Sequence, residues 1–70
     1  MFDQFSKKGM IVKISTLTNE EYFFKSNSKS DAKKYSKIIL KDGFYTTEID
    51  NYIKFYPSHM VKFIEVYPEK

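Results

Sequence analysis

The sequence predicts a single small α+β domain, in which a mostly antiparallel, curved sheet packs on one helix. Two observations lead to this fold. Segments rich in β-branched and aromatic residues lie on both sides of one segment with helical periodicity, so the expected order is β-β-α-β-β-β. The chain has only 70 residues and no cysteine, but it has seven Phe and six Tyr, so aromatic side chains rather than disulfides are expected to supply the core.

The first third of the chain predicts an arm followed by a β-hairpin. Residues 1–9 are mostly polar and are expected to form an N-terminal arm that precedes the domain, residues 10–70. The segment 10–16 (MIVKIST) is rich in β-branched side chains and predicts the first strand. The segment 21–25 (EYFFK) predicts the second strand, and a turn at 18–20 would join the two.

One helix is expected from residue 29 to residue 41. Ser28 is followed three residues later by Asp31, a pattern typical of a helix N-cap. Gly43 stands just beyond the last helical lysine, where a glycine commonly ends a helix. The helical spacing predicts a buried stripe made of Ala32, Tyr35 and Ile39, with Ile38 and Leu40 beside it.

Three further strands are expected after the helix. They comprise residues 44–49, 52–56 and 60–67, and a two-residue turn at 50–51 would join the first two. Pro68 ends the last strand because proline has no amide hydrogen for the ladder. Both faces of that last strand are apolar, so we expect it to be central or covered on both sides.

The aromatic residues exceed what one helix can cover. Three explanations remain open. The sheet could curl into a half-barrel, or pack against a second copy as a homodimer, since a large apolar patch usually marks an interface. Alternatively, the face could stack single-stranded bases, in which case the binding residues would be Tyr52, Lys54 and Tyr56.

Lysines recur every four residues along the predicted helix. Residues 25–41 hold six Lys and one Asp, a charge of +5, whereas the rest of the chain holds six Lys and eight acidic residues, a charge of −2. The net charge of +3 therefore conceals a strongly basic segment. On a helix this spacing places lysines in one row, made of Lys29, Lys33, Lys37 and Lys41, with Lys34 beside it.

Such a row can contact a phosphate backbone with an affinity that depends on salt but hardly on sequence. All twelve basic residues are lysine, and the absence of arginine argues against base reading through guanidinium groups. Two other interpretations of the row remain. It could meet an acidic patch on a protein partner, or it could be a helix face that only faces solvent.

The sequence carries no pattern that indicates catalysis. His59 is the only histidine, and with no cysteine and two glycines there is neither a zinc-ligand set nor a glycine-rich phosphate loop. We therefore expect no enzyme activity, no metal and no cofactor. No apolar run approaches about 18 residues, and the N-terminus lacks the features of a secretory signal, so we expect a cytoplasmic protein without membrane contact.

Three segments carry a resemblance to known proteins: IVKISTLTNEEYFFKS, SDAKKYSKIILKDGF and YIKFYPSHMVKFIEV. In style and order they resemble small α+β accessory proteins of phages, plasmids and other mobile elements of low-GC Gram-positive bacteria. The resemblance implies a small accessory or inhibitory binding protein, and it assigns no site residue.

Together these observations predict a binding protein of a phage or mobile element that contacts nucleic acid through the lysine row of its helix. The alternative is a protein–protein interaction module, homodimeric or modulating a host or element protein, that uses the aromatic face of the sheet.

Overall fold

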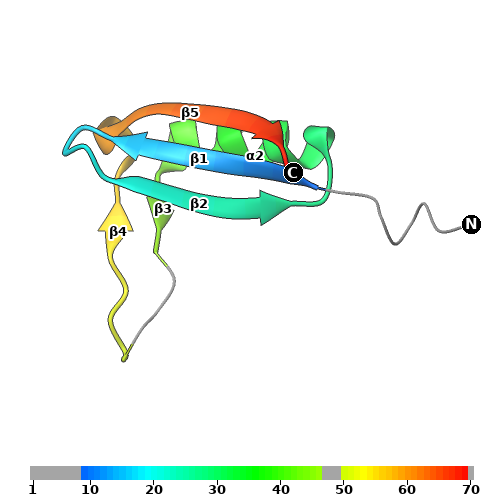
Figure 1. Cartoon of the computed structure of the whole chain (residues 1–70). Coiled ribbons are helices and arrows are strands. Elements are labelled where there is room, and N and C mark those ends of the chain that lie inside the picture. The colour runs from blue at the N-terminus through cyan, green and yellow to red at the C-terminus, as the bar shows by residue number, and fades with distance from the viewer. Residues whose placement is uncertain (1–8, 47–49, 70) are drawn as a thin grey trace, which may run out of the picture.

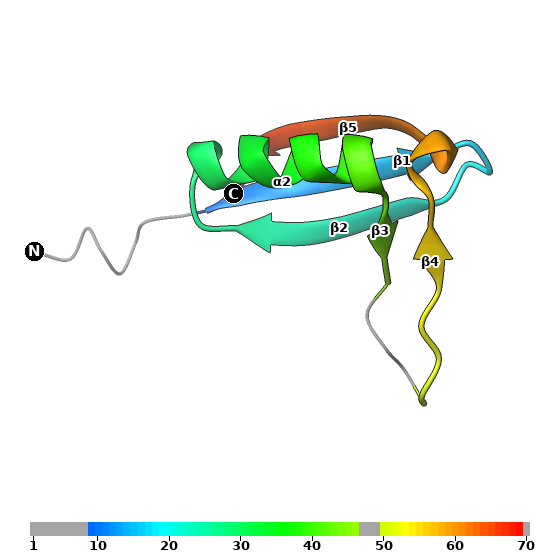
Figure 2. The same cartoon turned by 180° about the vertical axis from the view of Figure 1, so that it is seen from behind.

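A three-stranded antiparallel sheet forms one layer of the molecule, and one helix covers a single face of it (Figures 1 and 2). The computed structural model describes residues 9–46 and 50–69. The strand order is β2-β1-β5, and the strands comprise β1 (Met10–Thr16), β2 (Glu21–Ser26) and β5 (Val61–Pro68). The predicted α+β class and the order β-β-α-β-β-β are confirmed.

The central strand is β1. Its successive side chains point to opposite faces of the sheet, and this alternation decides which of them enter the core. Val12 and Ile14 point toward the helix and are buried, while Lys13 between them lies on the open face. β2 follows after a turn in which Asn19 has a φ of 65°, a left-handed conformation that Asn tolerates better than most residues. The predicted first hairpin is therefore confirmed.

The prediction that the last strand is central was wrong. β5 pairs only with β1 within the described sheet and forms one of its edges. It begins at Val61, because Met60 belongs to a short 3₁₀ helix, η1 (Ser58–Met60). Its second apolar face remains uncovered in the described part of the chain, where Phe63 and Tyr67 are exposed.

The helix, α2 (Lys29–Asp42), begins and ends as its sequence predicts. The hydroxyl oxygen of Ser28 accepts a hydrogen bond from the Asp31 amide at 3.1 Å, so the N-cap is confirmed. At the other end, the Gly43 amide donates to the carbonyl of Ile39 at 2.8 Å. Gly43 has a φ of 88°, and a Cβ there would collide with the carbonyl oxygen of Tyr56. Both the dihedral angle and the close approach require glycine.

The buried stripe of α2 differs from the prediction at one position. Ala32 and Ile39 are buried against β1, but Tyr35 is exposed. It lies on the β2 side of the helix, where its ring meets Phe24 edge-on at 6.2 Å. Ser36 takes the intervening turn and donates its hydroxyl to the Ala32 carbonyl at 2.8 Å. The small serine side chain thus satisfies its hydroxyl within the helix.

The next two strands form a separate unit, β3 (Phe44–Tyr45) and β4 (Phe55–Tyr56), which projects away from the main sheet (Figure 1). The predicted strands 44–49 and 52–56 are thus shortened, and residues 47–49 lie outside the described part. Asp50 and Asn51 have φ values of 54° and 65°, as a two-residue type I′ turn requires. We call β3, β4 and the described residues between them, 46 and 50–54, the aromatic hairpin.

Hydrogen bonds join the two ends of the described chain, Gly9 and Glu69. The Glu69 amide donates to the Gly9 carbonyl at 3.0 Å, and the Gly9 amide donates to the Glu69 carboxylate at 3.3 Å. The predicted N-terminal arm, residues 1–9, lies outside the described residues apart from Gly9.

The helix orientation can be tested with two neighbouring isoleucines. Ile39 is 7% exposed and Ile38 is 43% exposed. Replacing Ile39 with alanine leaves a cavity and should lower the free energy of unfolding by roughly 2–5 kcal/mol, and the milder Ile39→Val by roughly 0.5–1.5 kcal/mol. Ile38→Ala, the control, should cost less than about 1 kcal/mol. Chemical denaturation followed by circular dichroism measures all three, and equal losses for the two alanine variants would contradict this orientation.

Candidate functional site

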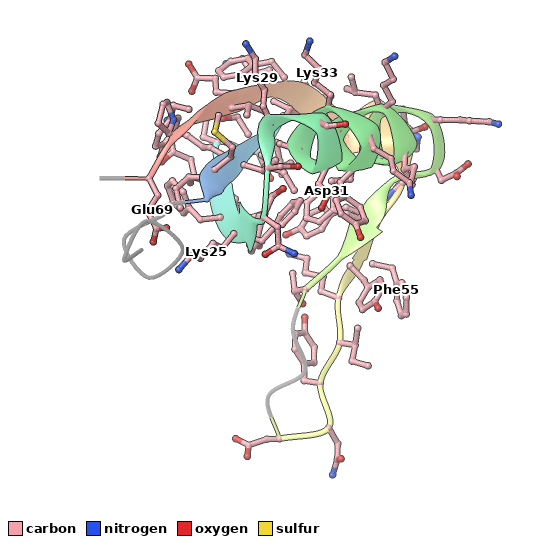
Figure 3. All side chains as sticks on the ribbon, turned by 90° about the vertical axis from the view of Figure 1, so that its right-hand side faces the viewer. Lys25, Lys29, Asp31, Lys33, Phe55 and Glu69 are labelled. Atoms are coloured by element: carbon pink, nitrogen blue, oxygen red, sulfur yellow. The ribbon has the colours of Figure 1, made fainter. Side chains whose placement is uncertain are left out.

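The lysines of α2 lie on the side of the helix that faces away from the sheet. At about 100° per residue, Lys34, Lys37 and Lys41 lie opposite the buried Ala32 and Ile39. The remaining two lie on one flank, and Figure 3 shows them pointing away from the molecule: Lys29 and Lys33. All five side chains are exposed, as the sequence predicted.

These five lysines differ from most others in having no acidic partner. Among the other described lysines, Lys13 lies 3.2 Å from Glu21 and 3.4 Å from Glu65. Similar pairs join Lys25 to Glu69 at 3.1 Å and Lys54 to Glu20 at 3.7 Å. Within residues 9–46 and 50–69, no carboxylate lies within 4.0 Å of a helix lysine.

The acidic residues of the helix lie on its other flank. At 100° per residue, Asp31 and Asp42 fall within about 20° of each other and on the opposite side of the buried stripe from Lys29. The solvent-facing surface of α2 is therefore divided into a basic face and a narrow acidic flank. We call the basic face, made of Lys29, Lys33, Lys34, Lys37 and Lys41, the lysine face.

A shallow depression lies within the lysine face. Its lining consists of Ser30, Lys33, Lys34, Lys37 and Ile38, and it is mostly apolar, because the aliphatic parts of the lysine side chains contribute to it.

The predicted base-stacking group is not formed. Tyr56 is only 5% exposed, because its ring stacks on Phe44 with centroids 4.8 Å apart. The Tyr56 ring therefore has no exposed face on which a base could stack. Lys54 is engaged too, since its ammonium pairs with Glu20 and lies 4.9 Å above the Tyr56 ring. Of the two tyrosines in this group, only Tyr52 is exposed.

The aromatic hairpin lies apart from the N-terminal half of the lysine face. Figure 3 shows Lys29 and Lys33 on the helix, pointing away from the molecule, and Phe55 on the hairpin. The C-terminal end of α2 adjoins the hairpin, since Asp42 and Phe55 line the same pocket.

Tyr56 instead holds the aromatic hairpin to the sheet. Its hydroxyl donates to the Glu20 carboxylate at 2.6 Å and lies 2.7 Å from the hydroxyl of Tyr22. Because the one hydroxyl hydrogen of Tyr56 goes to Glu20, Tyr22 must donate to Tyr56. The Tyr22 ring also contacts Phe44, with centroids 5.6 Å apart. These contacts join β2, β3 and β4.

The same contacts shift the pKa values of the groups involved. Burial, followed by the hydrogen bond to Glu20, raises the pKa of Tyr56 to about 12. The hydrogen bond from Tyr56, followed by one from Thr18, lowers the pKa of Glu20. The sequence analysis missed Glu20 and Tyr22, and no local pattern could have indicated them, because their contacts with Tyr56 span more than thirty residues.

The open face of the main sheet is mixed in character. Its centre is polar, because Lys13 pairs with carboxylates on both neighbouring strands. Three exposed aromatic side chains surround that centre: Phe23, Phe63 and Tyr67. The aromatic sheet face predicted for a protein partner therefore exists, but ion pairs interrupt it.

Two kinds of site are absent from residues 9–46 and 50–69. No three His, Asp or Glu side chains there are placed to hold a metal ion. No helix of this part is long and apolar enough to cross a membrane.

Comparison of the chain with known protein families, with curated proteins and with solved structures found no match.

The hydrogen bond between Glu20 and Tyr56 predicts a pH dependence of stability. The pKa of Glu20 lies below its ordinary value of 4.5 in the folded state, so this contribution is present above about pH 4.5 and is lost as the pH falls through the lowered value. The Glu20→Gln variant should therefore be less stable than the wild type at pH 7, and the difference should shrink toward pH 3.

Urea denaturation at a series of pH values measures this difference. The matched control introduces Glu20→Gln into a Tyr56→Phe background, where the substitution should have a smaller and flatter effect. A wild-type advantage that stays constant down to pH 3 would contradict this linkage.

Proposed function

We propose that this protein binds nucleic acid non-enzymatically, with the lysine face of α2 on the phosphate backbone. The observation that carries the proposal is that five exposed lysines share one side of a helix and, in the described part of the chain, lack carboxylate partners. Charge left unpaired at this density repels itself at the four-residue spacing of the row. A polyanion relieves that repulsion and releases its own counterions when it binds.

The dimensions of the lysine face suit a nucleic-acid strand. Successive lysines of the row are about 6 Å apart along the helix axis, so the row from Lys29 to Lys41 extends about 18 Å. A DNA duplex carries roughly ten phosphate charges over that length. The number of phosphates over this length thus exceeds the number of ammonium groups in the lysine face.

The proposed mode of binding is independent of base sequence. Lysine ammonium groups act as point charges, and the chain has no arginine to form paired hydrogen bonds with guanine. The contacts favoured by the lysine face are thus those that position a protein on a backbone. We include in this proposal the origin that the resemblance implies: a small accessory protein of a phage or mobile element would suit such a role.

A salt titration tests the proposal. Fluorescence anisotropy with a labelled DNA duplex should show binding at low salt. The logarithm of the binding constant should fall with the logarithm of the salt concentration at a slope of about −4 to −5. Between 50 and 200 mM salt, that slope corresponds to a loss of affinity of roughly 500-fold. Lys34→Gln/Lys37→Gln should reduce the steepness of the slope by about 2.

The control removes the same charge from another part of the surface. Lys25→Gln/Lys62→Gln lowers the net charge equally but leaves the lysine face intact, so its slope should stay close to the wild-type value. No binding at low salt would refute the proposal and leave the other two interpretations of the lysine face, an acidic protein partner or a face that only meets solvent. Equal changes in slope for both double variants would show that binding depends only on the net charge of the protein and not on the lysine face.

A further inference from the structure

The aromatic hairpin exposes a large apolar surface to solvent. Tyr45, Phe55 and Tyr52 are 67%, 71% and 64% exposed, and Ile53 beside them is exposed as well. Tyr45 and Phe55 face each other across the hairpin, with ring centroids 5.5 Å apart. A two-stranded hairpin is marginally stable by itself in water. Covering these rings with another apolar surface would therefore stabilise the hairpin.

An apolar groove of about 300 Å³ lies next to this hairpin. It runs between β2 and β3, and its walls are mostly aromatic: Tyr22, Phe23, Phe24, Phe44 and Tyr45. Since β2 is an edge strand of the described sheet, the groove is open along that edge. Phe23, itself 57% exposed, also borders the groove, although its side chain points to the face of the sheet that carries Lys13, opposite to Tyr22 and Phe24.

We infer that the groove of each chain receives the aromatic hairpin of a second copy, so that the protein is a two-fold symmetric dimer. A two-fold interface needs one surface that complements itself, with each copy contributing the same pair of elements. Here Tyr45 belongs both to the hairpin and to the wall of the groove. The two elements are therefore continuous, and a single reciprocal contact covers both.

The exposed apolar area reaches the lower limit for a stable dimer if the contact covers all of it. Taking about 200 Å² for each aromatic side chain, the exposed parts of Phe23, Tyr45, Tyr52 and Phe55, together with Ile53, amount to roughly 600 Å² per copy. Two copies would then bury about 1,200 Å², which is the lower limit of standard stable interfaces.

The charges allow this contact. The positive group of the hairpin, Lys54, is paired with Glu20 of the same chain. Lys29 and Lys33 of the lysine face point away from the hairpin that carries Phe55 (Figure 3), so contact through the hairpins does not require these two lysines to face those of a second copy. A highly charged foreign partner would find little to pair with in the groove, whereas an aromatic hairpin matches its chemistry.

The small core also favours a second copy as the occupant. Among the described residues the buried apolar side chains are few: Val12, Ile14, Ala32, Ile39 and Tyr56. A domain this small buries a low fraction of its surface and commonly gains stability by association. A second copy is present whenever the protein is made, so it can supply that stability at all times.

Sedimentation equilibrium tests the dimer directly. The wild type should sediment at twice its chain mass of 8.4 kDa, with a dissociation constant of about 10 µM or tighter. Phe55→Ser and Tyr45→Ser should each weaken the dimer at least tenfold. The control is Leu40→Ser, which removes an apolar side chain that is 54% exposed on α2 and should leave the dissociation constant unchanged.

Disulfide crosslinking tests the arrangement and does not depend on the stability of the serine variants. The chain has no cysteine, so single cysteines report cleanly. A mixture of Phe23→Cys and Phe55→Cys chains should form a crosslinked heterodimer on mild oxidation. A mixture of Leu40→Cys and Phe55→Cys chains, the control, should not.

Three outcomes would overturn the inference. The first is a monomer at about 200 µM, well above the expected dissociation constant. The second is a dimer that Phe55→Ser and Tyr45→Ser leave intact, which would place the interface on another face. The third is a failure of the Phe23→Cys and Phe55→Cys mixture to crosslink above its control. The nucleic-acid proposal does not enter any of these measurements, so either proposal can fail alone.

Discussion

The contact between one helix and the central strand controls the rest of this structure. Ala32 and Ile39 of α2 meet Val12 and Ile14 of β1, and these four side chains form the buried core cluster. Because a helix turns by about 100° per residue, burying two of its positions fixes the direction of all the others. The lysine face points to solvent for that reason, and the acidic flank lies on the opposite side.

A second constraint acts where the helix gives way to the aromatic hairpin. Gly43 lets the backbone approach the Tyr56 carbonyl closely enough to turn sharply out of the helix. The Tyr56 ring then packs on Phe44, and its hydroxyl bonds to Glu20. These contacts use the inner aromatic pair of the hairpin, and the outer pair, Tyr45 and Phe55, is consequently left exposed. The exposed surface is thus a direct result of how the hairpin is held.

The two surfaces have different chemistry and lie on different parts of the molecule. The lysine face is charged and formed by one helix, so it suits a partner recognised through its phosphates. The hairpin and its groove are apolar and formed by three strands, so they suit a partner recognised through shape. A dimer joined through the hairpins would carry two lysine faces and could engage a longer stretch of nucleic acid than one chain does.

The sequence by itself determined the features that depend on neighbours along the chain: the first hairpin, the cap at Ser28, the end of the helix at Gly43 and the lysine face. Local spacing decides these, because residues three or four apart share a helix face and residues two apart share a strand face. Only the tertiary structure decided that β1 is central, that Tyr35 is exposed and that Tyr56 is buried. These outcomes depend on strand order and on contacts such as that of Tyr56 with Glu20, which join residues far apart in the chain and leave no periodic signal in it.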